Sequence, residues 1–252
     1  MGIPRISLTI LKDSNCLALM LFGAGLLQAS TVTFTDGTFD LSDYSITTFQ
    51  SGGGTINVSQ TTTAGNPLPA MQVITTVSGT AGNFLGVGYF LNPSFAYNPG
   101  TQGAVTSIFF SEDINISVSG FGVFLASEGA ASLILQNGNM YIGYLSAPVN
   151  AGAWETVDGT ILQSNYDLIT NVNTLAVDST QHPNFASGPM EFGFINAWSS
   201  PSLSANVETA LFDNLTVTVD TASPEPATFS LLGAGLAGVS VGFVRRRKRE
   251  PL

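Results

Sequence analysis

The chain has 252 residues and a mass of 26.3 kDa, with 44% apolar and only 10% charged residues. This length fits one domain of up to about 200 residues plus terminal segments. All seven Lys and Arg residues lie near the two ends, so residues 31–220, with 14 Asp and Glu, carry a formal charge of −14. A body whose only basic side chain is His182 cannot neutralise phosphates, which excludes nucleic acids as partners.

The first 29 residues have the pattern of a secretory signal peptide. Arg5 and Lys12 give a positive start, residues 16–27 form an apolar run, and the small side chain of Ala29 favours cleavage after it. The export machinery is therefore an expected partner, and the alternative is a buried N-terminal helix. The only cysteine, Cys16, lies in this segment, so the exported body has no disulfide.

Between these segments, residues 30–221 have the pattern of an all-β domain. Short apolar runs alternate with period two and are separated every 8–12 residues by Gly, Asn, Asp, Pro or Ser. The clearest hairpin joins residues 132–136 to 139–145 through Asn137-Gly138, a pair that suits a type I′ turn. About a dozen strands in this length predict a two-sheet antiparallel β-sandwich of jelly-roll type.

Two segments at the ends of this body carry a weak family resemblance. Residues 39–44 and 211–217 look like the terminal strands of lectin-like and carbohydrate-binding jelly rolls. The resemblance implies a sandwich of the galactose-binding or the concanavalin type, and the residues do not separate these two.

The last segment, residues 222–252, has three parts in a fixed order. Pro224-Glu225-Pro226 comes first, and its prolines bias the residues before them away from helix. An uncharged stretch at 227–244 follows, which as a helix would span about 27 Å, the short end of what crosses a bilayer. The basic residues Arg245, Arg246 and Arg247 should then stay cytoplasmic, with the body on the outer side.

This three-part tail resembles the PEP-CTERM sorting signal of Gram-negative bacteria, also known as the ice-binding protein C-terminal domain. The resemblance implies that a membrane-embedded exosortase recognises and cuts the tail. It also implies transient anchoring, then release to the outer surface or to an exopolysaccharide or biofilm matrix. The alternative is an ordinary C-terminal anchor that is not processed.

Residues 233–238 in this tail also match the G-x-G-x-x-G fingerprint of dinucleotide-binding proteins. That fingerprint needs a preceding strand and a βαβ unit, whereas here a Pro-Glu-Pro motif precedes it. We therefore expect no nucleotide ligand.

The inventory of side chains permits little catalysis. His182 is the only histidine and no nucleophile motif accompanies it, and zinc sites need Cys or several His. A carboxylate pair for glycoside hydrolysis would have to come from residues such as Glu112 and Asp113, which alternate to opposite faces of a strand. We expect no enzyme activity.

Calcium is the metal that the acidic body could bind. By the parity of the last strand, Asp213 shares a face with Leu211, Leu215 and Val217, where an unpaired carboxylate would be costly. Either a backbone cap or Ca²⁺ would then be needed, and in the resembling jelly rolls the matching position commonly helps hold structural Ca²⁺. The acidic group at residues 36–43 is interpreted as a solvated loop.

Aromatic side chains are the candidates for stacking on sugar rings. Trp154 or Trp198 is predicted to lie in a loop and to bind a ligand. Tyr141 and Tyr144 should point to opposite faces of one strand, so that at most one is exposed.

Three functions follow from this reading. The first is an exported, non-enzymatic surface or matrix protein whose body binds polysaccharide. The second is a structural surface protein without a specific ligand, and the third is a hydrolase that acts on glycans.

Overall fold

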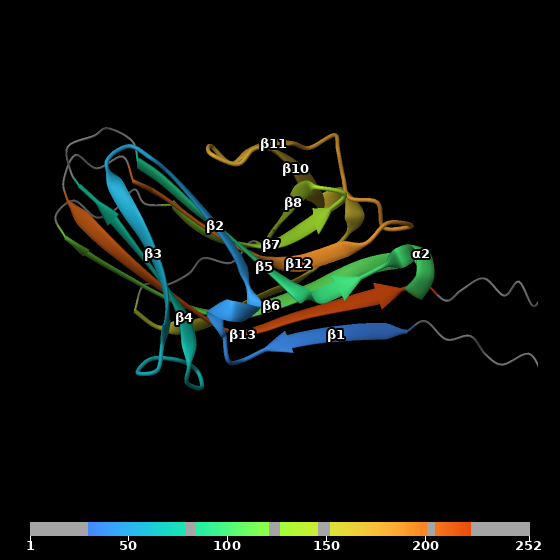
Figure 1. The fold of residues 1–252 in the computed structure, drawn as a ribbon, viewed down its shortest axis with the longest axis horizontal. Coiled ribbons are helices and arrows are strands. Elements are labelled where there is room, and N and C mark those ends of the chain that lie inside the picture. The colour runs from blue at the N-terminus through green and yellow to red at the C-terminus, as the bar shows by residue number, and fades with distance from the viewer. Residues whose placement is uncertain (1–29, 79–83, 121–126, 146–151, 201–204, 223–252) are drawn as a thin grey trace, which may run out of the picture. The chain divides into compact units, whose positions relative to one another are not determined.

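Two antiparallel sheets face each other in the computed structural model, which describes residues 30–78, 84–120, 127–145, 152–200 and 205–222. Sheet A has the strand order β3-β4-β13-β6-β9, with β1 also paired to β13, and sheet B has the order β11-β10-β8-β7-β12-β5-β2 (Figure 1). This arrangement confirms the predicted all-β two-sheet sandwich, whereas the predicted terminal helices lie outside the described residues. Ser30–Ala222 form one compact unit.

The strands of sheet A are β1 (Thr31–Asp36), β3 (Gly54–Thr61), β4 (Ala70–Val77), β6 (Val105–Gly120), β9 (Trp154–Ile161) and β13 (Asn206–Thr221). Those of sheet B are β2 (Ser45–Ser51), β5 (Phe84–Tyr97), β7 (Ser127–Gln136), β8 (Asn139–Tyr144), β10 (Tyr166–Asn171), β11 (Ala176–Asp178) and β12 (Met190–Ser200). Three short helices connect them in the described residues: η1 (Leu41–Asp43), α2 (Pro99–Gln102) and η2 (Gln163–Asn165).

The β7–β8 hairpin confirms the turn that the sequence predicted. Asn137 and Gly138 have φ angles of 52° and 79°, the left-handed values that both central residues of a type I′ turn need. Gln136 pairs with Asn139 across the turn, so the strands meet in the expected register.

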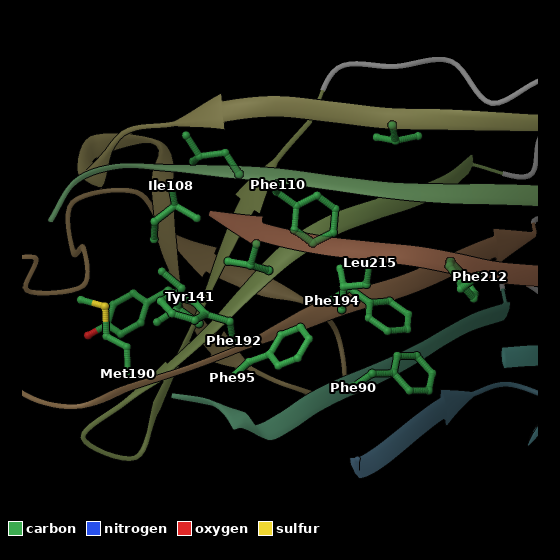
Figure 2. Close-up of a cluster of buried hydrophobic side chains, with 14 of the residues drawn as sticks. Phe90, Phe95, Ile108, Phe110, Tyr141, Met190, Phe192, Phe194, Phe212 and Leu215 are labelled. Carbon is green, nitrogen blue, oxygen red and sulfur yellow. The ribbon is translucent and has the colours of Figure 1, made fainter. Parts of the chain in front are cut away.

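The main core lies between the two sheets and is rich in phenylalanine (Figure 2). The Phe194 ring of sheet B lies 5.0 Å from that of Phe212 in sheet A and 4.6 Å from that of Phe90. Phe212 comes from a stretch of β13 in which buried and less buried positions alternate, whereas the chain neighbours of Phe90 in β5 and of Phe194 in β12 are buried as well. Burial of such side chains supplies the main free energy that holds the sheets together.

A second apolar cluster lies on the other face of sheet B. It contains Val87, Tyr89 and Ile195, and the connection between β10 and β11 covers it with Val172 and Leu175. The Tyr89 hydroxyl donates a 2.7 Å hydrogen bond to the Val172 carbonyl. Sheet B therefore packs apolar side chains on both faces, while the outer face of sheet A carries the more polar alternate residues.

The edge of β13 determines where the acidic residues meet. On one edge, β6 pairs with β13 from Asn206 to Thr221. Both β1 and β4 therefore pair with the opposite edge, β4 up to Phe212 and β1 from Leu215 onward. In Figure 1, β1 lies along one half of β13. Two residues, 213 and 214, remain between the two partner strands.

Candidate functional site

Asp213 lies at a bulge in β13, and this changes the face that the sequence predicted for it. The register between β13 and β6 shifts by one residue between Asp213 and Thr216, and Asn214 adopts a φ of 52°. Because a bulge adds one residue to the strand, Leu215 and Val217 turn into the core, whereas Asp213 does not share their face. The prediction that Asp213 shares a face with these two residues is therefore wrong.

The Asp213 carboxylate is fully buried and is capped by backbone N–H groups. Its Oδ2 accepts a short hydrogen bond from the Asn66 backbone N–H, and its Oδ1 accepts one of 2.8 Å from that of Asn214. Burial raises the pKa of Asp213, the two backbone donors lower it, and the charges of Asp113 and Asp36 raise it again. Of the two alternatives that the sequence allowed, a backbone cap or Ca²⁺, the structure therefore shows the backbone cap.

Asp113, the register partner of Asp213, accepts hydrogen bonds at both of its carboxylate oxygens. Its Oδ1 accepts from the Thr156 hydroxyl at 2.5 Å, and its Oδ2 accepts from the side-chain amides of Asn214 at 2.8 Å and Asn66 at 3.2 Å. Neutral donors therefore surround this carboxylate on the outer face of sheet A.

Asp36 ends β1 beside the same bulge and organises the turn that follows it. Its Oδ1 accepts from the backbone N–H groups of Thr38 and Phe39 at 2.8 and 2.9 Å. Its Oδ2 accepts from the Tyr44 hydroxyl at 2.8 Å. Asp40 caps η1 instead, so the acidic group at residues 36–43 shapes the turn locally.

The described residues do not fit the predicted Ca²⁺ site at Asp213. Calcium takes six to eight oxygen ligands, most of them with free lone pairs directed at the ion. Here N–H and O–H donors occupy the positions around Asp213, Asp113 and Asp36 where an ion would bind. Within the described parts of the chain, no three acidic, His or Cys side chains are placed to hold a metal ion.

Trp198 does not lie in a loop, and the prediction that it binds a ligand is not supported. It belongs to β12, is 1% exposed, and packs with Val77 and Phe84 between the sheets. Its ring centroid lies 5.9 Å from that of Phe84, and its buried Nε1–H has no hydrogen-bond partner among the residues that the structure describes. A sugar ring cannot reach this indole.

Trp154 does not lie in a loop either, because it begins the edge strand β9, where it is half-buried on the outer face of sheet A. Its cross-strand partner is Asn115 of β6. Asn115 in turn pairs with Leu211 of β13, and Leu211 pairs with Gln72 of β4. We call these four residues the Trp154 row. All four are partly exposed, so the row crosses four strands on an accessible face.

The tyrosines alternate as predicted. Tyr141 points into the main core, whereas Tyr144 is 54% exposed at the end of β8. The same alternation separates Glu112, which is fully buried, from Asp113 on the outer face. This pair therefore cannot act together on one substrate.

Asn66 is the site residue that the sequence analysis missed. It lies in the loop between β3 and β4 and contacts three residues of the bulge region through its backbone and side chain. No local pattern connects it with Asp213, which is 147 positions away in the chain. The one available signal in the sequence is Asn214 itself, because asparagine adopts a left-handed backbone more readily than most residues.

Comparison with known proteins identifies a known motif in one segment of the chain. Residues 224–248 match the family model described as a PEP-CTERM protein-sorting motif. Among solved structures, the chain is similar to the family 11 carbohydrate-binding module of cellulosomal cellulase Lic26A-Cel5E of Clostridium thermocellum. That match has 13% sequence identity and a TM-score of 0.38, and covers 77% of this chain and 96% of the module. No curated protein sequence matches the chain.

The motif match confirms the sorting signal predicted from Pro224, Glu225 and Pro226 and the arginines that follow. The structure of this segment lies outside the described residues. Among the residues that are described, none forms a helix long and apolar enough to cross a bilayer. The chain carries a PEP-CTERM sorting motif at its C-terminal end, which implies an exported surface protein that an exosortase processes.

Proposed function

We propose that the protein is a non-enzymatic component of the cell surface or exopolysaccharide matrix, and that its body binds a neutral polysaccharide along the Trp154 row. The row carries the proposal because it joins an accessible indole to hydrogen-bonding amides. With strands about 4.8 Å apart, its four residues span about 14 Å, which suits an oligosaccharide segment. Trp154 offers a ring face for stacking, and Asn115 and Gln72 offer amide donors and acceptors.

The charge of the body supports a neutral ligand. Residues 31–220 contain 14 acidic side chains and no Lys or Arg, and Asp113 and Asp158 lie on the same outer face as the Trp154 row. An anionic polysaccharide would meet a repulsive potential without a basic partner. A neutral chain of hydroxyl groups would instead find carboxylate and amide acceptors.

Affinity electrophoresis tests this function. The protein is run through gels containing hydroxyethyl cellulose, xyloglucan or galactomannan, with alginate as the anionic probe. We expect retardation by at least one neutral polysaccharide and none by alginate. Trp154→Ala should weaken binding about tenfold, the equivalent of about 1.4 kcal/mol, whereas Tyr144→Ala, an exposed aromatic on the other sheet, should leave it unchanged. Equal mobility in all gels would favour the structural protein without a ligand.

A further inference from the structure

The gap on the edge of β13 is filled by one loop residue. β4 stops pairing at Phe212 and β1 starts at Leu215, which leaves Asp213 and Asn214 without a neighbouring strand on that edge. The loop between Thr61 and Ala70 brings Asn66 to this gap. An unpaired edge inside a sheet would leave backbone groups exposed to solvent and competing partners.

Asn66 is bound as a strand residue would be, but by side chains. Its backbone N–H donates to the Asp213 carboxylate, and its backbone carbonyl accepts from the side-chain amide of Asn214. Its own side-chain amide donates to Asp113 at 3.2 Å. Asp213 and Asn214 thus provide the acceptor and the donor that the backbone of a partner strand would have provided.

The donors also replace a cation. Asp213 accepts two backbone N–H groups and Asp113 accepts two side-chain amides and one hydroxyl. Bringing two carboxylates together at this position would be costly without such partners. The donors around them therefore perform the role that the sequence analysis gave to Ca²⁺.

The clamped loop lies next to the Trp154 row. Asp113 and Asp213 precede and follow Asn115 and Leu211 by two residues on the same face of β6 and β13. Two residues along a strand measure about 7 Å. Asn66 is hydrogen bonded to both aspartates, so the loop at residues 62–69 passes beside the surface that we assign to the polysaccharide.

We propose that Asn66, Asp113, Asp213 and Asn214 form a metal-free clamp that fixes the 62–69 loop as one border of the polysaccharide surface. That the 62–69 loop borders a polysaccharide surface rests on the proposed function. The clamp makes Asn214 a positioning residue: it contacts no ligand itself, and its side chain holds the loop that does. The clamp itself is a property of the fold and stands independently of the ligand.

Hydrogen exchange measured by mass spectrometry on the full chain in detergent micelles tests the clamp. Asn214→Gly removes the side-chain amide but keeps a residue that tolerates a φ of 52°. We expect exchange in peptides covering residues 62–70 to become at least tenfold faster. Asn137→Gly is the matched control, because Asn137 has the same φ of 52° in the β7–β8 turn. It should leave this loop unchanged.

A second variant and the addition of Ca²⁺ separate the clamp from a metal site. Asp213→Asn places an amide donor where an N–H group now needs an acceptor. Hydrogen exchange in the peptides covering residues 62–70 should therefore become faster. Millimolar Ca²⁺ and EDTA should give the wild-type protein identical exchange and identical melting curves. Slower exchange of residues 62–70 in Ca²⁺, lost in Asp213→Asn, would overturn the metal-free clamp, as would wild-type exchange in Asn214→Gly.

Affinity electrophoresis with the same neutral polysaccharides then tests the border. Asn214→Gly should bind several-fold more weakly than the wild type and Asn137→Gly equally well. Faster loop exchange with unchanged retardation would show that the loop does not border the surface. If Trp154→Ala also leaves retardation unchanged, the proposed function fails, whereas the exchange data still decide the clamp.

Discussion

Replacing Glu112 by leucine should raise the melting temperature of the body at neutral pH. Glu112 is 0% exposed on the inner face of β6, and within the described part of the chain neither of its carboxylate oxygens has a hydrogen-bond partner. Burial, and then the charge of Asp113, raise the pKa of Glu112 well above its ordinary value of 4.5. The charged form of Glu112 is therefore disfavoured on a face that Phe110, Ile114 and other side chains of the main core share.

The expected gain follows from two costs that leucine removes. Burial disfavours the ionised form of this carboxyl, so at pH 7 the folded state has to protonate it or hold a desolvated charge. Either cost is roughly 3 kcal/mol, the scale at which an uncompensated buried charge destabilises a protein. Burying a neutral polar group without a partner adds roughly 1–3 kcal/mol, and overpacking by leucine offsets a similar amount. A net gain of about 3 kcal/mol corresponds to roughly 6–12 °C for a body of this size.

Thermal unfolding of the compact unit Ser30–Ala222, followed by circular dichroism at pH 7 and pH 4, measures this gain. Because folding raises the pKa of Glu112, its contribution is fully present below pH 4.5 and is lost as the pH rises through the folded pKa. The advantage of Glu112→Leu should therefore be large at pH 7 and small at pH 4. Asp158→Asn removes the same charge from an exposed position of β9 and serves as the control.

Three outcomes would refute this reasoning. Glu112→Leu could lower the melting temperature at pH 7, which would mean that the carboxyl has a stabilising partner. The gain could be as large at pH 4 as at pH 7, so that no proton is involved. Asp158→Asn could give the same gain, in which case general repulsion within the acidic body explains it.

Three further changes test the sorting signal, the core and the second apolar cluster. Replacing Pro224-Glu225-Pro226 by alanines should leave an uncut precursor in the membrane fraction. Variant and wild type with the same mass by mass spectrometry and the same distribution between cell fractions would contradict exosortase processing. Trp198→Ala should lower the free energy of unfolding by about 3–5 kcal/mol because it leaves a cavity in a packed site. A variant that melts normally but is no longer retarded in polysaccharide gels would show instead that Trp198 contacts the ligand. Tyr89→Phe removes the hydrogen bond to Val172, so exchange of residues 171–176 should quicken by about fivefold; no change there, with Tyr144→Phe as the control, would show that this bond does not hold the β10–β11 connection.

Local patterns predicted the fold class and several faces of the sandwich. Period-two alternation identified the strands, and Asn137-Gly138 identified a turn that needs positive φ at both residues. The opposite exposure of Tyr141 and Tyr144, and of Glu112 and Asp113, follows from the pleat of a single strand. The sorting motif was recognisable because its three parts are contiguous in the chain.

The sequence by itself determined what depends on neighbours in the chain: the strands, the β7–β8 turn, the acidic charge of the body and the sorting tail. Only the tertiary structure decided the rest. A bulge at Asp213 reversed the faces of Leu215 and Val217, because one left-handed residue breaks the period on which parity reasoning depends. The opposite sheet covered Trp198, and two partner strands that stop short on one edge of β13 made room for Asn66. Such contacts join residues more than a hundred positions apart, and no local preference of the chain specifies them.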